Sequence, residues 1–167
     1  MASVIIQGSA RKDGNTSIAG RYLQQHTNSE IIDLLDLKFS GYDYQHRNKD
    51  DDFLPSMKQL VSQCDTFYFL TPVYWYTMSG PMKNFLDRLT DCVTIEKEIG
   101  SQMKGKNLGL ISMGSEEAVN PHFDEPFRLT AGYLYMEYLG HCHTWCENET
   151  LAPKAKEAIK TLARKTA

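Results

Sequence analysis

The sequence predicts an α/β fold in which a parallel sheet carries helices on both faces. Short apolar stretches, typical of buried strands, alternate five times with segments in which apolar residues recur at helical spacing. The length of 167 residues suits one domain with a full hydrophobic core, and we expect residues 1–167 to form it. Three of the expected strands run into polar or aromatic loops. These loops should meet at the carboxyl edge of the sheet, where open α/β sheets bind ligands.

The amino-terminal stretch begins with a short buried strand, residues 2–7, and continues as a polar loop, residues 8–16. Apolar residues within 17–26 then follow helical spacing. The unpaired N–H groups at the start of such a helix converge, and the helix dipole adds partial positive charge, so we expect the loop to bind an anion. The side chains that could contact phosphate oxygens are Ser9, Arg11, Asn15, Thr16 and Ser17.

Two familiar phosphate loops do not fit this stretch. A nucleoside-triphosphate loop needs a lysine after its second glycine, whereas here five residues separate Gly8 from Gly14 and Asn15 follows. The G-x-G-x-x-G fingerprint of dinucleotide-binding proteins is also missing. The hydroxyl-rich loop suits a terminal phosphomonoester, as in a mononucleotide. The alternative is that Asn15 or Thr16 only caps the helix.

A second strand is expected at residues 30–37 and a helix at 53–63, with a polar loop at 38–52 between them. His46 in that loop lies near the acidic run 50–52, a combination that could suggest a metal site. A solvated face and an acid-rich helix start explain the same residues, and we favour that interpretation.

The third strand, residues 64–71, leads into an aromatic loop at 72–80 and then into a helix for which Ser79 is the expected cap. The run Tyr-Trp-Tyr at 74–76 should therefore lie at the carboxyl edge of the sheet. Three large aromatic side chains at that edge suit a flat, conjugated ligand. The alternative is a structural loop that covers the core or forms an oligomer interface.

The second half of the chain completes the alternation. A strand at 107–113 ends in Gly114 and Ser115, which should form a third loop at the same edge. Before this strand, residues 90–106 suggest a loose, mobile connection. The remaining expected elements are a helix within 121–139 that starts near Pro126 and is ended by Gly140, a strand at 141–147, and a helix at 152–165.

The composition is that of an ordinary soluble globular protein, with 41% hydrophobic residues and a net charge of −3. This balance lacks the basic footprint typical of proteins that bind nucleic acid. No apolar run approaches the roughly 20 residues that span a bilayer. The amino terminus also lacks the charged region of a signal peptide. We expect a cytoplasmic protein that binds neither nucleic acid nor membrane.

The four cysteines are too scattered for a disulfide framework. Cys142 and Cys146 have His141 and His143 beside them, which raises the alternative of a zinc site. Their spacing differs from the common C-x2-C ligand pair, and on a strand the two cysteines would face one side and the two histidines the other. We therefore favour structural roles and expect no metal.

With these pieces in place, the sequence resembles the flavodoxin-like NAD(P)H-dependent FMN reductase and quinone reductase family. The resemblance covers most of the chain and is carried by GSARKDGNT at 8–16 and by TPVYWYTMSGPMKNFLDR at 71–88. It implies a flavodoxin-like three-layer sandwich whose five-stranded parallel sheet has the strand order 2-1-3-4-5. It also implies bound FMN, NAD(P)H as electron donor, and a homodimer or homotetramer.

The resemblance assigns roles to residues in three loops. The first motif would hold the FMN phosphate, the loop after the third strand would wrap the isoalloxazine ring, and the loop after the fourth would meet the far edge of the ring. The residues implied for the phosphate are Ser9, Arg11, Asn15, Thr16 and Ser17. Those implied for the ring are Pro72, Val73, Tyr74 and Trp75, together with a weaker match at Met113, Gly114 and Ser115.

One departure from the family pattern concerns the acidic stretch DDDF at 50–53. It resembles the iron–sulfur branch of the family, which has a cysteine cluster just upstream. Here the corresponding stretch SGYDYQHRNK, at 40–49, contains no cysteine, so nothing could hold such a cluster. We therefore expect a flavin-only protein.

The implied reaction passes a hydride from NAD(P)H through FMN to a small acceptor such as a quinone, a nitroaromatic or free flavin, with ping-pong kinetics. No side chain needs to act as a nucleophile or general base, and the sequence contains neither G-x-S-x-G nor H-E-x-x-H. Two alternatives stay open. One is a flavodoxin-type electron carrier, although such carriers are usually strongly acidic. The other is a non-catalytic module that binds flavin or senses redox state.

Overall fold

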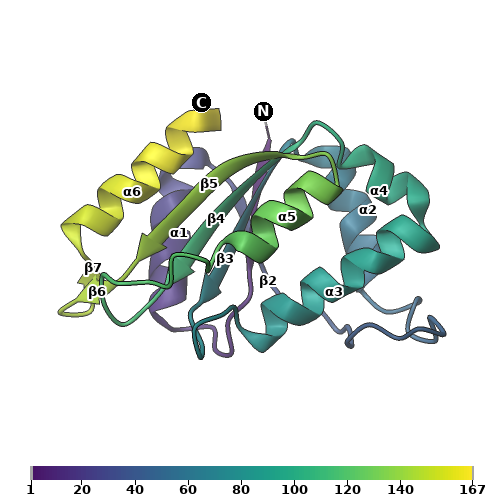
Figure 1. The fold of residues 1–167 in the computed structure, drawn as a ribbon, viewed down its shortest axis with the longest axis horizontal. Coiled ribbons are helices and arrows are strands. Elements are labelled where there is room, and N and C mark those ends of the chain that lie inside the picture. The colour runs from purple at the N-terminus through teal and green to yellow at the C-terminus, as the bar shows by residue number, and fades with distance from the viewer. Residues whose placement is uncertain (1, 167) are drawn as a thin grey trace.

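The computed structural model describes residues 2–166 and contains a five-stranded parallel sheet between two layers of helices (Figure 1). The strand order is β2-β1-β3-β4-β5, which confirms the predicted three-layer sandwich and its topology. The strands of this sheet are β1 (Ser3–Gln7), β2 (Glu30–Asp33), β3 (Thr66–Pro72), β4 (Asn107–Met113) and β5 (Glu137–Thr144). The helices are α1 (Asn15–Thr27), α2 (Phe53–Gln63), α3 (Gly80–Thr94), α4 (Lys97–Gln102), α5 (Glu125–Tyr133) and α6 (Pro153–Ala163).

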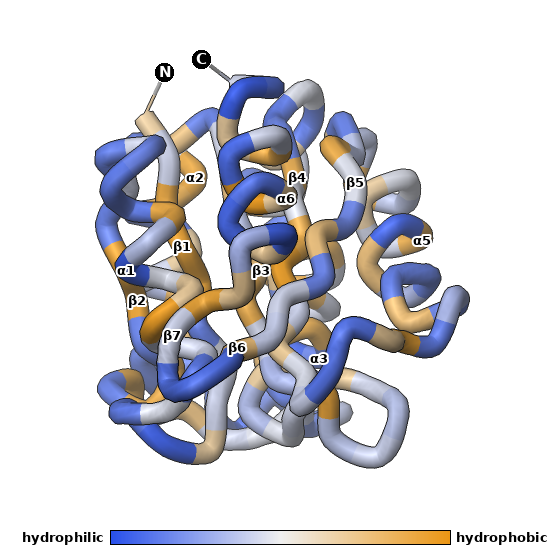
Figure 2. Tube along the Cα trace, turned by 90° about the vertical axis from the view of Figure 1, so that its left-hand side faces the viewer, coloured by the Kyte–Doolittle hydropathy of each residue, from blue (hydrophilic) through white to orange (hydrophobic). Residues whose placement is uncertain are grey.

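Two apolar cores hold the layers together. Side chains alternate along β3, so that Phe67 and Phe69 join one core while Tyr68 and Leu70 join the other. Helices α2, α3, α4 and α5 cover the first core, and α1 and α6 cover the second (Figure 1). The most apolar stretches of the chain accordingly lie in the middle strands (Figure 2). This is the pattern of parallel strands buried on both faces.

The helix after the third strand begins as predicted and extends further than predicted. Ser79 has extended backbone geometry, and its Oγ accepts a hydrogen bond from the N–H of Met82 at 3.2 Å. The prediction of a loose connection at 90–106 is wrong, because α3 occupies its first part and α4 its middle. Cys92 and Ile99 anchor these helical turns in the core. Within residues 2–166, no helix is both long enough and apolar enough to cross a membrane.

The predicted long helix before the last strand is much shorter. Helix α5 spans Glu125–Tyr133, so its start near Pro126 agrees with the prediction, but β5 already begins at Glu137, so the predicted carboxyl end is wrong. Tyr135 has a φ of 56°, a left-handed conformation that leaves the helix. Gly140 does not end a helix; it lies inside β5 with a φ of 107°, where the register with β4 shifts. The closely spaced apolar residues of this stretch fit both the helical period of 3.6 residues and the strand period of 2, so the pattern alone did not separate helix from strand.

Two strands end earlier than predicted, at points where the chain turns. The predicted strand at 30–37 ends at Asp33, where a turn begins. The last strand of the sheet ends at Thr144, and the chain then forms a small antiparallel hairpin of β6 (Cys146–Glu147) and β7 (Thr150–Leu151). This hairpin lies beside the end of β5 and leads into α6 (Figure 1).

The loop at 34–52 is fastened to α3 by a buried arginine. Arg88 is 0% exposed and donates hydrogen bonds to the carboxylates of Asp51 and Asp91. On the other side of Asp91, Nδ1 of His46 lies 2.8 Å from Oδ1. The expected solvated acidic run is therefore wrong for Asp51, which is partly buried, while its neighbours on either side in the run are exposed.

Candidate functional site

Three loops, which follow β1, β3 and β4, meet at the carboxyl edge of the sheet (Figure 1). Ser79 joins the first two loops, because its Oγ donates a hydrogen bond of 2.7 Å to the carbonyl of Gly8. Val73 joins the last two, because its N–H donates to the carbonyl of Met113 at 2.8 Å. Gly8 has no room for a side chain, since a Cβ there would lie 2.9 Å from the Cβ of Met82. The structure thus brings the three predicted loops together.

The first loop ends at the amino terminus of α1. Gly14 precedes the helix, and no side chain caps it. The alternative in which Asn15 or Thr16 only caps the helix is therefore wrong, since both lie inside α1. The first amides of a helix have no intrahelical partner, so this end of α1 can receive an anion.

The five side chains predicted to contact phosphate differ in exposure. Arg11 and Asn15 are exposed, while Ser9, Thr16 and Ser17 are buried. The Arg11 side chain lies over Gly14, where a Cβ would come within 2.7 Å of Nε. The Oγ of Ser17 donates to the carbonyl of Lys12 and accepts from Nε2 of Gln7, and these bonds hold the loop closed. The exposed pair and the helix amides are the groups that an arriving ligand meets first.

The aromatic loop after β3 is a tight turn. Tyr74 and Thr77 exchange backbone hydrogen bonds of 2.9 and 3.1 Å around two central residues, Trp75 and Tyr76. Both central residues are left-handed, with φ values of 48° and 67°. Turns of this kind usually carry Asn-Gly, and a bulky residue in such a conformation costs on the order of 1–3 kcal/mol. Trp75 is 91% and Tyr76 73% exposed, so burial within this chain does not offset the strain.

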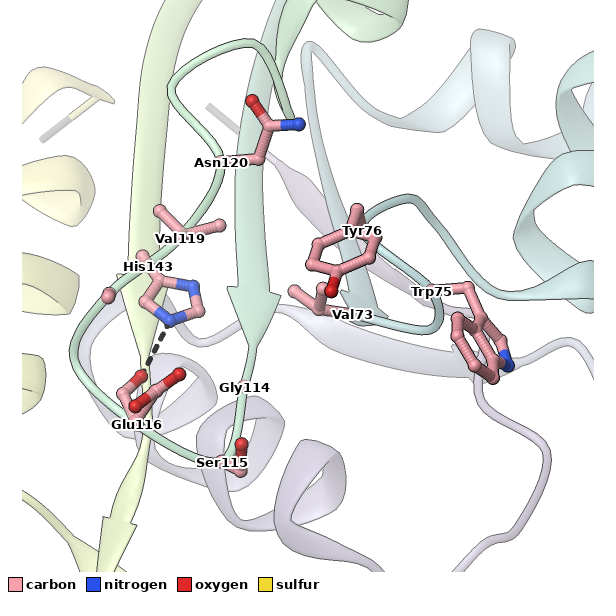
Figure 3. A pocket seen from close by; sticks show the side chains of 10 residues that line it. Val73, Trp75, Tyr76, Gly114, Ser115, Glu116, Val119, Asn120 and His143 are labelled. Carbon is pink, nitrogen blue, oxygen red and sulfur yellow. Dashed lines mark hydrogen bonds between the residues drawn. The ribbon is translucent and has the colours of Figure 1, made fainter.

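This turn borders a cleft of about 510 Å³ at the ends of β3 and β4 (Figure 3). Val73 and Tyr76 lie on one side of the end of β4, and His143 and Glu116 lie on the other (Figure 3). The cleft is lined by Val73, Trp75, Tyr76, Gly114, Ser115, Glu116, Ala118, Val119, Asn120 and His143. Its volume and its mixture of aromatic, small and polar walls suit a planar ring system.

Of the residues predicted to contact a ring, four belong to the lining of this cleft: Val73, Trp75, Gly114 and Ser115. Three others are not among its lining residues. Pro72 and Met113 are buried register partners in β3 and β4, and Tyr74 opens the aromatic turn. The residues predicted for phosphate lie in the first loop and the first turn of α1, outside the cleft lining.

Sequence reasoning missed His143 as a cleft residue. Its Nε2 lies 3.0 Å from the carbonyl of Glu116, which belongs to the third loop (Figure 3). The ring packs against Gly114, where a Cβ would come within 2.7 Å of Cε1. Burial lowers the pKa of His143 below its ordinary value of 6.5, so the ring is neutral at pH 7. Strand alternation, which puts His141 and His143 on one face, was the available signal.

The two parts of the edge differ in charge. Among the described residues, the cleft lining contains one charged side chain, Glu116, whereas the first loop carries Arg11, Lys12 and Asp13, of which Lys12 pairs with Asp36. Arg11 and the open amides of α1 therefore suit an anionic group, and an uncharged ring suits the cleft. Cys142 packs in the second core, on the face away from the histidines. Across residues 2–166, no three His, Cys, Asp or Glu side chains are grouped so that they could hold a metal ion.

Comparison with known proteins gives a consistent set of relatives. The sequence pattern of the NADPH-dependent FMN reductase family matches residues 1–151. An NADPH azoreductase of Bacillus sp. (strain OY1-2) is 31% identical over 99 residues. The match covers 59% of this chain and 56% of the azoreductase, which is little more than half of that relative. A putative NAD(P)H-dependent FMN-containing oxidoreductase of Bacillus subtilis (strain 168) is 29% identical over 129 residues, or 70% of this chain and 68% of that relative.

Solved structures show that the fold is shared. The Trp repressor binding protein from Bacillus subtilis has a TM-score of 0.75 at 21% identity, over 99% of this chain and 97% of that chain. General stress protein 14 from Treponema denticola, solved in complex with FMN, has a TM-score of 0.67 at 17% identity, over 99% of this chain and 95% of that chain.

Proposed function

The chain belongs to the NADPH-dependent FMN reductase family, and on that premise we propose that it is an FMN-dependent oxidoreductase. It would pass a hydride from NAD(P)H to a small acceptor such as a quinone, an azo compound, a nitroaromatic or free flavin. The observation that carries this proposal is the cleft of about 510 Å³ at the same sheet edge as the open amino terminus of α1.

The first loop fits the phosphate of FMN. The open amides of α1 and the guanidinium of Arg11 would neutralise the phosphate charge. Gly8 packs against Met82 of α3 and Gly14 against Arg11, so these contacts hold the loop backbone in place beside the amino terminus of α1. The side chains assigned to the phosphate are Ser9, Arg11, Asn15, Thr16 and Ser17.

The cleft between the aromatic turn and the third loop fits the isoalloxazine ring. The residues assigned to the ring are Pro72, Val73, Tyr74, Trp75, Met113, Gly114 and Ser115. Pro72 and Met113 would act through their backbones, because their side chains are buried. Gly114 packs directly against His143, where a Cβ would come within 2.7 Å of the ring, and this contact would hold the third loop beside the isoalloxazine.

Bound FMN supplies the hydride chemistry, and the residues of this chain position it and shield it from water. Trp75 and Tyr76 would shape the slot beside the ring, and backbone N–H groups of the aromatic and third loops would stabilise negative charge at the ring edge. NAD(P)H and the acceptor would occupy this slot in turn, which gives ping-pong kinetics.

A visible absorption spectrum of the purified protein tests the proposal, taken before and after anaerobic addition of NADPH or NADH. We expect flavin bands that bleach. Bands that persist with both donors would contradict the oxidoreductase and favour an electron carrier or a redox sensor. A protein without flavin after incubation with FMN would contradict the assignment of all three loops.

A homodimer or homotetramer is the oligomeric state that the family resemblance favours. Leu129, Tyr133 and Tyr135, on and just after α5, are exposed large apolar side chains and support such an assembly. Light scattering on the flavin-loaded protein tests it, and a monomer at micromolar concentration would contradict it. A cytoplasmic location stays a prediction of the sequence.

A further inference from the structure

Ser112 of β4 lies between two histidines of β5. Its Oγ is 2.7 Å from Nε2 of His141 and 2.7 Å from Nδ1 of His143. The strand register explains this placement, because Ser112 pairs directly with His143, and His141 comes two residues earlier on the same face. Ser112 is 0% exposed, so the contact is built into the strand pair.

The hydrogen bonds around Ser112 have a defined direction. The carbonyl of Glu116 can only accept, so Nε2 of His143, at 3.0 Å, carries a proton. In a neutral ring Nδ1 of His143 is then an acceptor, and the Ser112 hydroxyl donates to it. Because the hydroxyl has one proton, it must accept from Nε2 of His141. Burial lowers the pKa of His141 to about 4 and lowers that of His143, which keeps both rings neutral at pH 7.

These hydrogen bonds connect the outermost strand of the sheet, β5, with the cleft at the carboxyl ends of the strands. His141 belongs to the edge strand β5, is partly exposed, and stacks on Phe123 with ring centroids 5.4 Å apart. His143, at the other end of these hydrogen bonds, lines the cleft. A proton could therefore enter at one end and leave at the other.

The proposed reaction consumes such a proton. NAD(P)H gives up a hydride, which carries two electrons and one proton, whereas a quinone or azo group reduced by two electrons binds two protons. The second proton must come from solution. We propose that His141, Ser112 and His143 form a relay that delivers this proton to the acceptor in the cleft, an inference that rests on the proposed function.

Each member of the relay gains one proton and loses one. A proton from water binds Nδ1 of His141, and the Nε2 proton of His141 moves to Oγ of Ser112. Ser112 passes its own proton to Nδ1 of His143, whose Nε2 proton leaves the Glu116 carbonyl for an oxygen or nitrogen of the reduced acceptor. Once the acceptor has left, Nε2 of His143 takes a proton from water in the cleft, its Nδ1 proton passes back through Ser112 to Nε2 of His141, and Nδ1 of His141 releases its proton to water, which restores the starting state. His143 is the catalytic residue, and Ser112 and His141 are positioning residues.

Ser112→Ala tests the relay in flavin-loaded protein that NADPH has reduced, with reoxidation followed by stopped flow. Two acceptors are compared: a quinone, which takes protons with its electrons, and ferricyanide, which takes electrons alone. We expect reoxidation by the quinone to slow about 10²-fold, the effect typical of a positioned proton donor. Reoxidation by ferricyanide and reduction by NADPH should be unchanged. Ser29→Ala, another buried serine that lies just before β2, is the matched control.

A second variant and a spectroscopic measurement make the test independent of one substitution. In His141→Asn the side-chain amide can still donate to Ser112 but cannot pass a proton, so the quinone reaction alone should slow. Nitrogen-15 NMR of the flavin-free protein should show His141 and His143 neutral and protonated at Nε2. A proton on Nδ1 of His143 in the wild type would overturn the relay.

The failure of the relay and the failure of the proposed function are distinguishable. Equal slowing with both acceptors, or no slowing with either, would overturn the relay and leave the oxidoreductase intact. A wild-type flavin that neither NADPH nor NADH reduces would overturn the oxidoreductase, and the relay with it.

Discussion

Arg88 and Asp51 form a bidentate ion pair that joins α3 to the loop before α2. Nη1 lies 2.6 Å from Oδ2, and Nη2 lies 3.1 Å from Oδ1. The same guanidinium donates from Nε to Asp91 at 2.7 Å and lies 4.8 Å from the centre of the Phe53 ring. Burial alone would raise the pKa of Asp51, but the bonds from Arg88 and from backbone amides outweigh it and lower this pKa. The buried charges therefore depend on one another.

Removal of the arginine should be costly. Arg88→Met would leave the carboxylates of Asp51 and Asp91 without their buried partner, a loss of about 3–5 kcal/mol in the free energy of unfolding. Urea denaturation measures it. Arg47→Met is the control, because Arg47 pairs with Asp43 at the surface and such pairs contribute about 1 kcal/mol or less. Equal losses in the two variants would contradict the importance assigned to the buried pair.

A methyl group at Gly114 should disturb the cleft. In Gly114→Ala the new Cβ would collide with the His143 ring, so we expect a loss of about 1–3 kcal/mol in stability. FMN affinity should also fall, because the third loop must shift. Gly132→Ala in α5 is the control, since a Cβ there meets no atom within 4 Å and alanine favours helices by about 1 kcal/mol. Fluorescence titration with FMN and thermal unfolding measure both effects, and unchanged FMN affinity in Gly114→Ala would contradict the prediction.

We expect Trp75 and Tyr76 in the aromatic turn to lower the stability of the fold and to strengthen ligand binding. Replacing Trp75 and Tyr76 by Asn and Gly supplies the pair that left-handed turn positions prefer, so the double variant should be more stable by about 1 kcal/mol or more. It should also bind FMN or the acceptor more weakly, because both rings are lost. Trp75→Ala alone should weaken binding without the gain in stability. If the double variant retains wild-type flavin content and acceptor kinetics, the turn has no part in binding.

Mild acid should destabilise the fold through His141. Burial lowers its pKa from 6.5 to about 4, while the charge of Asp124 acts in the opposite sense and His143 adds to the lowering. Between pH 6.5 and about 4 the unfolded chain binds a proton at this ring and the folded chain does not. The free energy of unfolding should therefore fall as the pH drops through this window. Urea midpoints of the wild type should drop more steeply there than those of His141→Gln, and parallel curves would contradict this assignment.

Much of the fold could be predicted because its units are local. Apart from α4, each strand and helix between residues 2 and 113 leaves a pattern within about 30 residues, and the strand order follows from family resemblance. The cap at Ser79 and the three loops at one edge were read correctly for the same reason. Helix α4 was missed because it has few apolar residues, and the carboxyl end of α5 was placed too late because the apolar residues that follow this helix fit both the helical and the strand period.

The parts of the fold and of the candidate site that sequence reasoning missed depend on contacts between distant segments. Arg88 meets Asp51 across 37 residues of sequence, and no periodicity pairs them. His143 reaches Glu116 and Ser112 only through the register of β4 and β5, which the pattern of either strand alone does not fix.

The aromatic turn also gives the protein an optical property. The chain has two tryptophans, of which Trp75 is 91% exposed beside the cleft and Trp145 is 9% exposed against the second core. Their fluorescence should therefore appear in separate parts of the emission band, the exposed indole at longer wavelength and the buried one at shorter wavelength. A molecule that stacks on the turn would quench the long-wavelength part first, whereas unfolding would shift the short-wavelength part. The turn and the core beside the cleft can thus be followed in one unlabelled sample, the core through Trp145, whose ring stacks on that of His143 with centroids 6.3 Å apart.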